Sequence, residues 1–275
     1  MSRMKWIAVP LVAAGFVTTL AACGDSSSTS STSSTSSTSS TARNASNVEA
    51  ASVAWSYKGD TGPANWGTLS PAYAACDKTS QTPIDIVDPA SATLPDLTIN
   101  YSEGAVKQFN NGHSVEAEAA AGNSITVDGT TSKLLQMHFH AKSEHTFNGN
   151  HSPVEVHFVH KSNADVLTVI GVMLEKGSSS NAAWEPFVKA IGTPQGTTKT
   201  TTFDWPAMLP TSLQSVRYSG SLTTPPCTEK VNWLVMKKPV TLSQTQINAI
   251  TAVYSDNYRP VQPLNDRTVE ITPVP

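Results

Sequence analysis

Runs of lysine and arginine are missing from this 275-residue sequence, which carries 18 basic and 21 acidic side chains. Proteins that bind nucleic acids need a basic patch or stripe to meet the phosphates. We therefore expect no nucleic-acid partner. Internal repeats and a second linker are also missing, so the sequence predicts one large folded domain.

Long apolar runs are limited to residues 6–22, which is short for a membrane-spanning helix of about 20 residues. The run follows Arg3 and Lys5 and ends in LAAC, residues 20–23. A basic start, an apolar segment and small residues before a cut are typical of an export signal. The cysteine at the cut resembles the lipobox of bacterial lipoproteins. We therefore predict a signal peptide over residues 1–22 and a lipid on Cys23; the alternative is an ordinary signal with a chance cysteine.

A tract of serine and threonine alone follows at residues 26–41. Such a tract has no apolar surface to bury, so it cannot offset its ordering entropy. Residues 23–50 are therefore predicted to be a disordered tether, and residues 51–275 the folded domain. We expect an exported protein of the cell envelope or periplasm, anchored by lipid to a bacterial membrane.

Cysteines are few, and each has a predicted role. Cys23 goes to lipid, which leaves Cys76 and Cys227. Two thiols in an exported chain most simply pair, because the compartment is oxidising. Two buried free thiols are the alternative.

Helical patterns are rare in the predicted domain. Residues 243–258 begin with a capping box, Ser243 to Gln246, and have apolar residues at helical spacing. A second short helix is predicted over residues 181–192. Elsewhere short apolar alternations are broken by Gly, Pro, Asn and Asp, as in HSVEAEA, LLQMHFH, VEVHFVH and VNWLVM. This pattern predicts a mainly β fold, a single domain around a mostly antiparallel sheet with short peripheral helices.

The stretch QMHFHAKSEH, residues 136–145, holds three of the seven histidines. Side chains alternate faces along a strand, so Gln136, His138 and His140 share one face. Two imidazoles in this arrangement suit two corners of a tetrahedral metal site. Coincidence or a buried hydrogen bond is the alternative explanation of such a pair.

A second strand, residues 154–160, offers one more ligand. Glu155 and His157 share a face, and His160 points the other way. Metal-bound histidines usually donate their second N–H to a carboxylate or carbonyl, so Glu155 favours His157. Three imidazoles with one open position are typical of catalytic zinc.

A competing interpretation is a cupin-type site, in which Glu144 would itself bind the metal after HFHAKSE. That site needs a second motif ending in histidine on a later hairpin, which we do not find convincingly. His145 and His160 are predicted to be structural, and His151 to lie exposed in a turn.

Six motifs stand in order along the chain: QTPIDI (81–86), NNGHSV (110–115), QMHFHAKSEHT (136–146), EVHFVH (155–160), SLTTPPCTEKVNW (221–233) and NYRPVQPLNDR (257–267). Together they resemble the α-class carbonic anhydrases over about residues 53–270. The resemblance implies that family's fold and zinc-dependent, reversible hydration of CO₂. In the family, the reference case for such chemistry, zinc lowers the pKa of bound water to about 7, and the hydroxide attacks CO₂.

The resemblance also implies a role for each matching residue. Zinc is bound by His138, His140 and His157. Glu144 accepts a hydrogen bond from the Thr223 hydroxyl, which orients the attacking oxygen, and His113 is the proton shuttle. The remaining implied residues are the partners of the ligands, Gln136, Glu155 and the Asn257 carbonyl; the substrate pocket, Val159, Val169, Leu222, Val231, Trp233 and Thr224; the water network, Tyr57, Asn111 and again Thr224; and the disulfide pair, Cys76 and Cys227.

Three residues depart from the family pattern. Met137 stands where Phe is frequent, and Ala141 where Trp or Thr is frequent, so both are expected to affect packing or metal retention. Glu116 replaces a neutral polar residue near the rim, where it would affect proton transfer or inhibitor binding. The functional alternative is a non-catalytic binding module on a tether.

Overall fold

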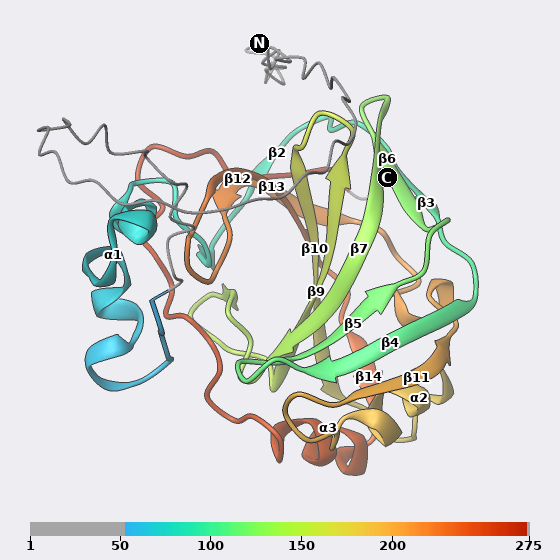
Figure 1. The fold of residues 1–275 in the computed structure, drawn as a ribbon. Helices are drawn as coiled ribbons and strands as arrows, with labels where there is room; N and C mark the ends of the chain where they lie inside the picture. The colour runs from blue at the N-terminus through green and yellow to red at the C-terminus, as the bar shows by residue number, and fades with distance from the viewer. Residues whose placement is uncertain (1–52, 274–275) are drawn as a thin grey trace, which may run out of the picture. The chain divides into compact units, whose positions relative to one another are not determined.

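The computed structural model of the protein describes residues 53–273. A mixed sheet of thirteen strands forms its framework, and β7, β9 and β10 run side by side through its centre (Figure 1). The main path of the sheet has the order β11-β4-β5-β7-β9-β10-β13-β12-β15-β2. Only three pairs within it are parallel, β10 with β13, β10 with β14, and β15 with β2. The predicted mainly β fold is confirmed.

The fifteen strands are short except near the centre of the sheet. Their bounds are β1 Asp85–Ile86, β2 Ala90–Ser91, β3 Leu97–Asn100, β4 Gly104–Asn110, β5 Val115–Ala119, β6 Ser124–Val127, β7 Thr130–His140, β8 Thr146–Phe147, β9 Val154–Ser162, β10 Leu167–Lys176, β11 Thr198–Phe203, β12 Ser215–Ser221, β13 Glu229–Met236, β14 Val240–Leu242 and β15 Glu270–Ile271. β1 and β8 form a separate two-stranded sheet.

The α-helices are α1 Trp66–Leu69, α2 Glu185–Ala190 and α3 Gln244–Thr251. The predicted capping box is present in α3, because Ser243 and Gln246 each bond the other's backbone N–H. The helix predicted over residues 181–192 is a 3₁₀ turn, Ala182–Trp184, followed by α2. Other 3₁₀ turns are Gly59–Thr61, Pro63–Asn65, Pro71–Asp77 and Pro206–Met208.

The central strands bury both of their faces. On β9, Val156 and Phe158 enter the larger core, which also contains Phe187 of α2 and Ile250 of α3. Val159 points the other way, into a second apolar cluster. The second face can therefore present polar side chains to a site while the first face anchors the sheet.

A β-bulge lies just before the histidines of β7. The register with β9 shifts between Leu134, opposite His160, and Gln136, opposite Val159. Leu135 is left 41% exposed, while Leu134 enters the larger core. Because one extra residue reverses the alternation, the bulge lets Leu134 face the core while Gln136 faces the other side.

The predicted disulfide between Cys76 and Cys227 is present. Both cysteines are buried in a small cluster with Trp66 and Tyr73. Within residues 53–273, no helix has the length and apolar composition needed to cross a membrane. The predicted signal peptide, the lipid on Cys23 and the tether lie outside the described residues.

Candidate metal centre

Adjacent strands bring together the three histidines predicted as ligands. His138 on β7 stands directly opposite His157 on β9. The ring of His140 lies 5.0 Å from that of His138 and 4.7 Å from that of His157, measured between centroids. Strand alternation and cross-strand register are therefore enough to form the cluster.

Each histidine is oriented by a hydrogen bond from its outer ring nitrogen. The Nδ1 atoms of His138 and His140 lie 2.8 Å from Gln136 Oε1 and 2.7 Å from the Asn257 carbonyl. The Nε2 atom of His157 lies 2.9 Å from Glu155 Oε1. Because these oxygens accept, the outer nitrogens carry the protons. The inner lone pairs therefore belong to Nε2 of His138, Nε2 of His140 and Nδ1 of His157.

These residues have the properties of a metal site. Their candidate ligand atoms all lie within 4.8 Å of one another. Burial lowers the pKa of all three imidazoles, that of His140 to about 3, so they are neutral at neutral pH. Nε2 of His140 is buried and has no hydrogen-bond partner among the described residues. Such an atom is costly unless something binds it, so the donor set fits a cation held by neutral imidazoles.

Glu155 holds the third ligand through a dense set of bonds. Its carboxylate accepts from the backbone N–H groups of Glu144 and His145, and from the ring nitrogens of His145 and His157, at 2.7 to 2.9 Å. Burial would raise the pKa of Glu155, but the two histidines lower it well below its usual range. Gly171 leaves room for the carboxylate, since a Cβ there would lie 2.9 Å from Glu155 Oε1.

The two histidines predicted to be structural make buried hydrogen bonds. The second ring nitrogen of His145 lies 2.6 Å from the Tyr218 hydroxyl. His160 lies on the opposite face of β9, between the Tyr101 hydroxyl and the Thr168 carbonyl. Neither belongs to the group formed by His138, His140 and His157.

Glu144 is fully buried beside the histidines but is not part of the ligand group. Oε1 accepts from the backbone N–H of Arg259 at 2.8 Å, and Oε2 has no hydrogen-bond partner in the described part of the chain. Burial raises the pKa of Glu144 well above its usual range, opposed by the Arg259 N–H and the Thr223 hydroxyl. This arrangement does not support the cupin-type site. The Thr223 hydroxyl is near enough to lower the pKa of Glu144, but the two side chains do not meet the distance and angle of a hydrogen bond, so that bond stays a prediction.

The residues predicted to form the substrate wall belong to one apolar cluster. Val159, Val169 and Trp233 lie opposite one another on β9, β10 and β13. The Trp233 ring lies 4.8 Å from the His157 ring. Val231 is buried in the same cluster, and Leu222 packs against it. An apolar surface therefore reaches the metal ligands from one side.

His113 lies in the turn between β4 and β5, where Asn111 Oδ1 accepts from its backbone N–H at 2.9 Å. Its ring stacks on Trp55, with the centroids 3.8 Å apart and the planes at 10°. Partial burial lowers the pKa of His113. The His113 carbonyl accepts from Asn257 Nδ2 at 3.0 Å. Asn257 thus contacts both the shuttle candidate and His140.

The three departures from the family pattern lie around the same strands. Met137 and Ala141 are fully buried in the larger core, on the side away from the ligands. Glu116 stands opposite His138 on the neighbouring strand β5 and accepts from Asn111 Nδ2 at 3.4 Å. Burial raises the pKa of Glu116.

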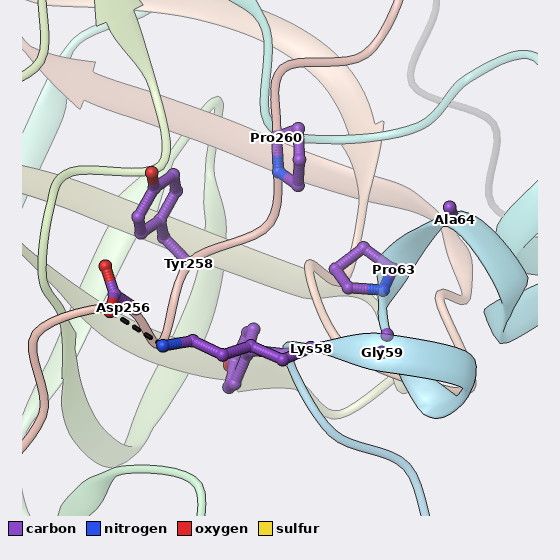
Figure 2. Close-up of a pocket in the computed structure, with 9 residues that line it drawn as sticks. Lys58, Gly59, Pro63, Ala64, Asp256, Tyr258 and Pro260 are labelled. Atoms are coloured by element: carbon purple, nitrogen blue, oxygen red, sulfur yellow. Dashed lines mark hydrogen bonds and ion pairs between the residues drawn. The ribbon is translucent and has the colours of Figure 1, made fainter.

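A pocket of about 440 Å³ lies on the outer side of the loop that carries Asn257. Figure 2 shows its rim, where Lys58 and Asp256 form an ion pair at 2.9 Å. Tyr57 and Tyr258 also line it. None of the three candidate ligands does. Tyr57, predicted for the water network, therefore lines this pocket, and its pKa is raised by burial and by the charge of Glu144.

Sequence reasoning missed several neighbours of the site. Trp55 and Tyr218 carry no motif signal, and only the tertiary contacts reveal them. Arg259 stands inside the motif NYRPVQPLNDR, and Gln81 begins QTPIDI. A buried arginine or glutamine within a matching motif is the signal that would have found these two.

Comparison with known proteins gives a consistent result. A sequence profile of the eukaryotic-type carbonic anhydrase family matches residues 61–273. A carbonic anhydrase of Pectobacterium atrosepticum is 40% identical over 223 residues, which cover 79% of this chain and 91% of the relative. One from Klebsiella pneumoniae is 40% identical over 78% of this chain and 89% of its own.

Solved structures agree with the sequence matches. The α-carbonic anhydrase of Thermovibrio ammonificans, solved with the inhibitor sulfanilamide, has a TM-score of 0.77 and 41% identity. The match covers 79% of this chain and 99% of that one. The α-carbonic anhydrase of Photobacterium profundum has a TM-score of 0.75 and 38% identity, over 79% and 100% of the two chains.

Proposed function

The chain belongs to the α-carbonic anhydrase family, and from that premise we propose that His138, His140 and His157 hold a zinc ion during its reaction. The enzyme catalyses the reversible hydration of CO₂ to bicarbonate and a proton. One observation carries the zinc proposal: the outer nitrogens of the three imidazoles are all hydrogen-bonded, and their inner lone pairs converge. When bound, zinc supplies the Lewis acidity that activates water at neutral pH.

The chain's own residues would orient the reactants. Glu144 would accept a hydrogen bond from the Thr223 hydroxyl. The Thr223 oxygen would then be free to accept a hydrogen bond from the nucleophile. Glu144 is held in position because it is buried and accepts a hydrogen bond from the Arg259 backbone N–H. The wall of Val159, Val169 and Trp233 would hold CO₂, because moving an apolar molecule from water to an apolar surface is favourable in free energy.

Proton removal would be the task of His113. Its ring is half-buried, and its lowered pKa keeps it neutral and able to accept a proton at neutral pH. Tyr57, Asn111 and Thr224 would order water between the centre and this ring. Stacking on Trp55 places the ring in a defined position from which it can release the proton.

Metal content measured together with CO₂ hydration tests the zinc proposal. We expect a chelator to abolish activity and added zinc to restore it. His138→Ala should lose both metal and activity, whereas the control His151→Ala, at an exposed histidine whose ring bonds the Ser143 carbonyl, should keep both. A zinc-loaded protein with no activity would instead favour the non-catalytic binding module.

We further propose export and lipid anchoring of the enzyme through Cys23. The support is the order of basic residues, apolar run, cysteine and Ser/Thr tract in residues 1–50. The lipid would hold the enzyme at a bacterial membrane, within the periplasm or cell envelope. Cys23→Ser should move the activity from the membrane fraction to the soluble fraction. Retention of the Cys23→Ser variant on membranes would contradict the lipid anchor.

A further inference from the structure

Arg259 is a buried arginine with no role in the proposed reaction, yet it contacts the site. It is 2% exposed, and its backbone N–H donates to Glu144 Oε1 at 2.8 Å. Its guanidinium donates to three oxygens: Gln81 Oε1 at 2.8 Å, the Thr82 carbonyl at 2.9 Å and the Cys76 carbonyl at 2.9 Å. Arg259 therefore ties the position of Glu144 to residues 76–82.

Gln81 makes the corresponding connection to the loop of Thr223. It is 2% exposed, and the oxygen that accepts from Arg259 also lies 3.3 Å from the Ser221 hydroxyl. Its amide nitrogen donates to the Cys227 carbonyl at 3.3 Å. Ser221 and Cys227 stand on either side of Thr223 in the chain, so Gln81 holds both ends of the segment that carries it.

Two further sets of bonds reinforce this link. Thr82 and Ser221 exchange hydrogen bonds, each backbone N–H donating to the other's hydroxyl at 2.9 to 3.0 Å. The disulfide joins Cys76, whose carbonyl accepts from Arg259, to Cys227. The buried residues Cys76, Gln81 and Thr82 thus form a brace between the backbone around Glu144 and the loop of Thr223.

We infer that Arg259 and Gln81 are positioning residues that fix the separation between the Glu144 carboxylate and the Thr223 hydroxyl. The inference rests on the proposed pairing of Glu144 with Thr223. A hydrogen bond is sensitive to displacements of a few tenths of an ångström. The fork of an arginine suits this role, because its donors stand in a rigid plane.

The test is a set of double-mutant cycles. Arg259→Lys keeps the charge and loses the fork, and Gln81→Leu keeps the approximate size and loses the shared oxygen. Each is made in the native chain and in Thr223→Ala. In the native chain we expect kcat for CO₂ hydration to fall roughly tenfold, with KM and zinc content unchanged. In Thr223→Ala we expect no further fall, because the positioned group is gone.

A matched control is Arg217→Lys. Arg217 is a half-buried arginine whose guanidinium likewise donates to protein oxygens, the Pro95 carbonyl at 2.6 Å and Ser215 Oγ at 3.1 Å, and it has no bond to Glu144 or residues 76–82. Its kcat should stay within twofold of the native value. Melting temperatures of all variants are measured alongside, and a fall in kcat that follows the loss in melting temperature across the set, control included, would overturn the inference.

Other outcomes distinguish a failure of the positioning role from a failure of the pairing between Glu144 and Thr223. The positioning role is wrong if Thr223→Ala slows turnover but Arg259→Lys and Gln81→Leu do not. It is also wrong if Arg259→Lys and Gln81→Leu lower kcat by the same factor in Thr223→Ala as in the native chain. If Thr223→Ala itself leaves turnover unchanged, the proposed pairing fails, and the positioning role fails with it. Should Arg259→Lys not fold, Gln81→Leu alone still decides between these results.

Discussion

Loss of the disulfide should cost the enzyme much of its stability. Cys76 and Cys227 are 151 residues apart, so the bond removes a very large loop from the freedom of the unfolded chain. The loop-entropy relation gives about 5 kcal/mol for a loop of this length at 25 °C. Measured values usually fall below this limit, and we expect the reduced enzyme to lose about 3 to 5 kcal/mol. The free energy of unfolding of a domain is itself only about 5 to 15 kcal/mol.

Urea unfolding followed by tryptophan fluorescence measures this difference. The native chain is compared in oxidised and reduced form, which keeps both buried sulfur atoms and changes only the link between them. The double variant Cys76→Ala, Cys227→Ala is then measured, and its additional loss reports the packing of the sulfur atoms. Zinc content is held equal, because bound metal also stabilises the folded state.

A difference below about 1 kcal/mol between oxidised and reduced enzyme would refute this reasoning. It would mean that the unfolded chain already keeps the two segments together, or that the native bond stores compensating strain. The single variants Cys76→Ala and Cys227→Ala are the controls. Each should have the free energy of unfolding of the reduced enzyme, less the contribution of the one buried sulfur atom that it removes, since each lacks the same link.

The remaining predictions concern the centre itself. Glu155→Gln should weaken zinc binding by roughly 10- to 100-fold in a chelator competition, since it removes charge and an acceptor beside His157, whereas Glu103→Gln, at an exposed position just before β4, should not. His113→Ala should retain zinc but slow turnover, and added imidazole should restore the rate; an unchanged rate would remove His113 as the shuttle. Because burial lowers the pKa of His113, Trp55→Ala should raise it toward 6.5, and an NMR titration of the ring that shows no rise would contradict the role of stacking.

Strand alternation made the metal centre predictable to a large extent. His138, His140 and His157 were selected by parity and by the neighbouring Gln136 and Glu155, and the structure brings all three together. No sequence pattern revealed the bulge at Leu135. Its absence from the prediction did no harm, because the bulge lies before the histidines and changes parity only on its far side.

Contacts between distant segments were less accessible. The Asn257 carbonyl that orients His140 was expected only from the family resemblance, since a backbone acceptor 117 residues away leaves no pattern in the sequence. The bonds that Arg259 and Gln81 make in the brace were not foreseen at all. These bonds depend on loops whose paths are set by tertiary packing, not by hydrophobic periodicity.

The sequence by itself determined the mainly β class, the capped helix α3, the pairing of two cysteines, the family and the identity of the three candidate ligands. These follow from local periodicity, residue chemistry and ordered motifs, which need no knowledge of distant contacts. Only the tertiary structure decided which ring nitrogens face inward, where the ring of His113 rests, and how Glu144 is held relative to Thr223. His138 and His157 bond residues two positions away. The other properties depend on contacts between distant segments, such as His140 with Asn257, His113 with Trp55 and Arg259 with Gln81. Such contacts exist only once the sheet and its loops have packed.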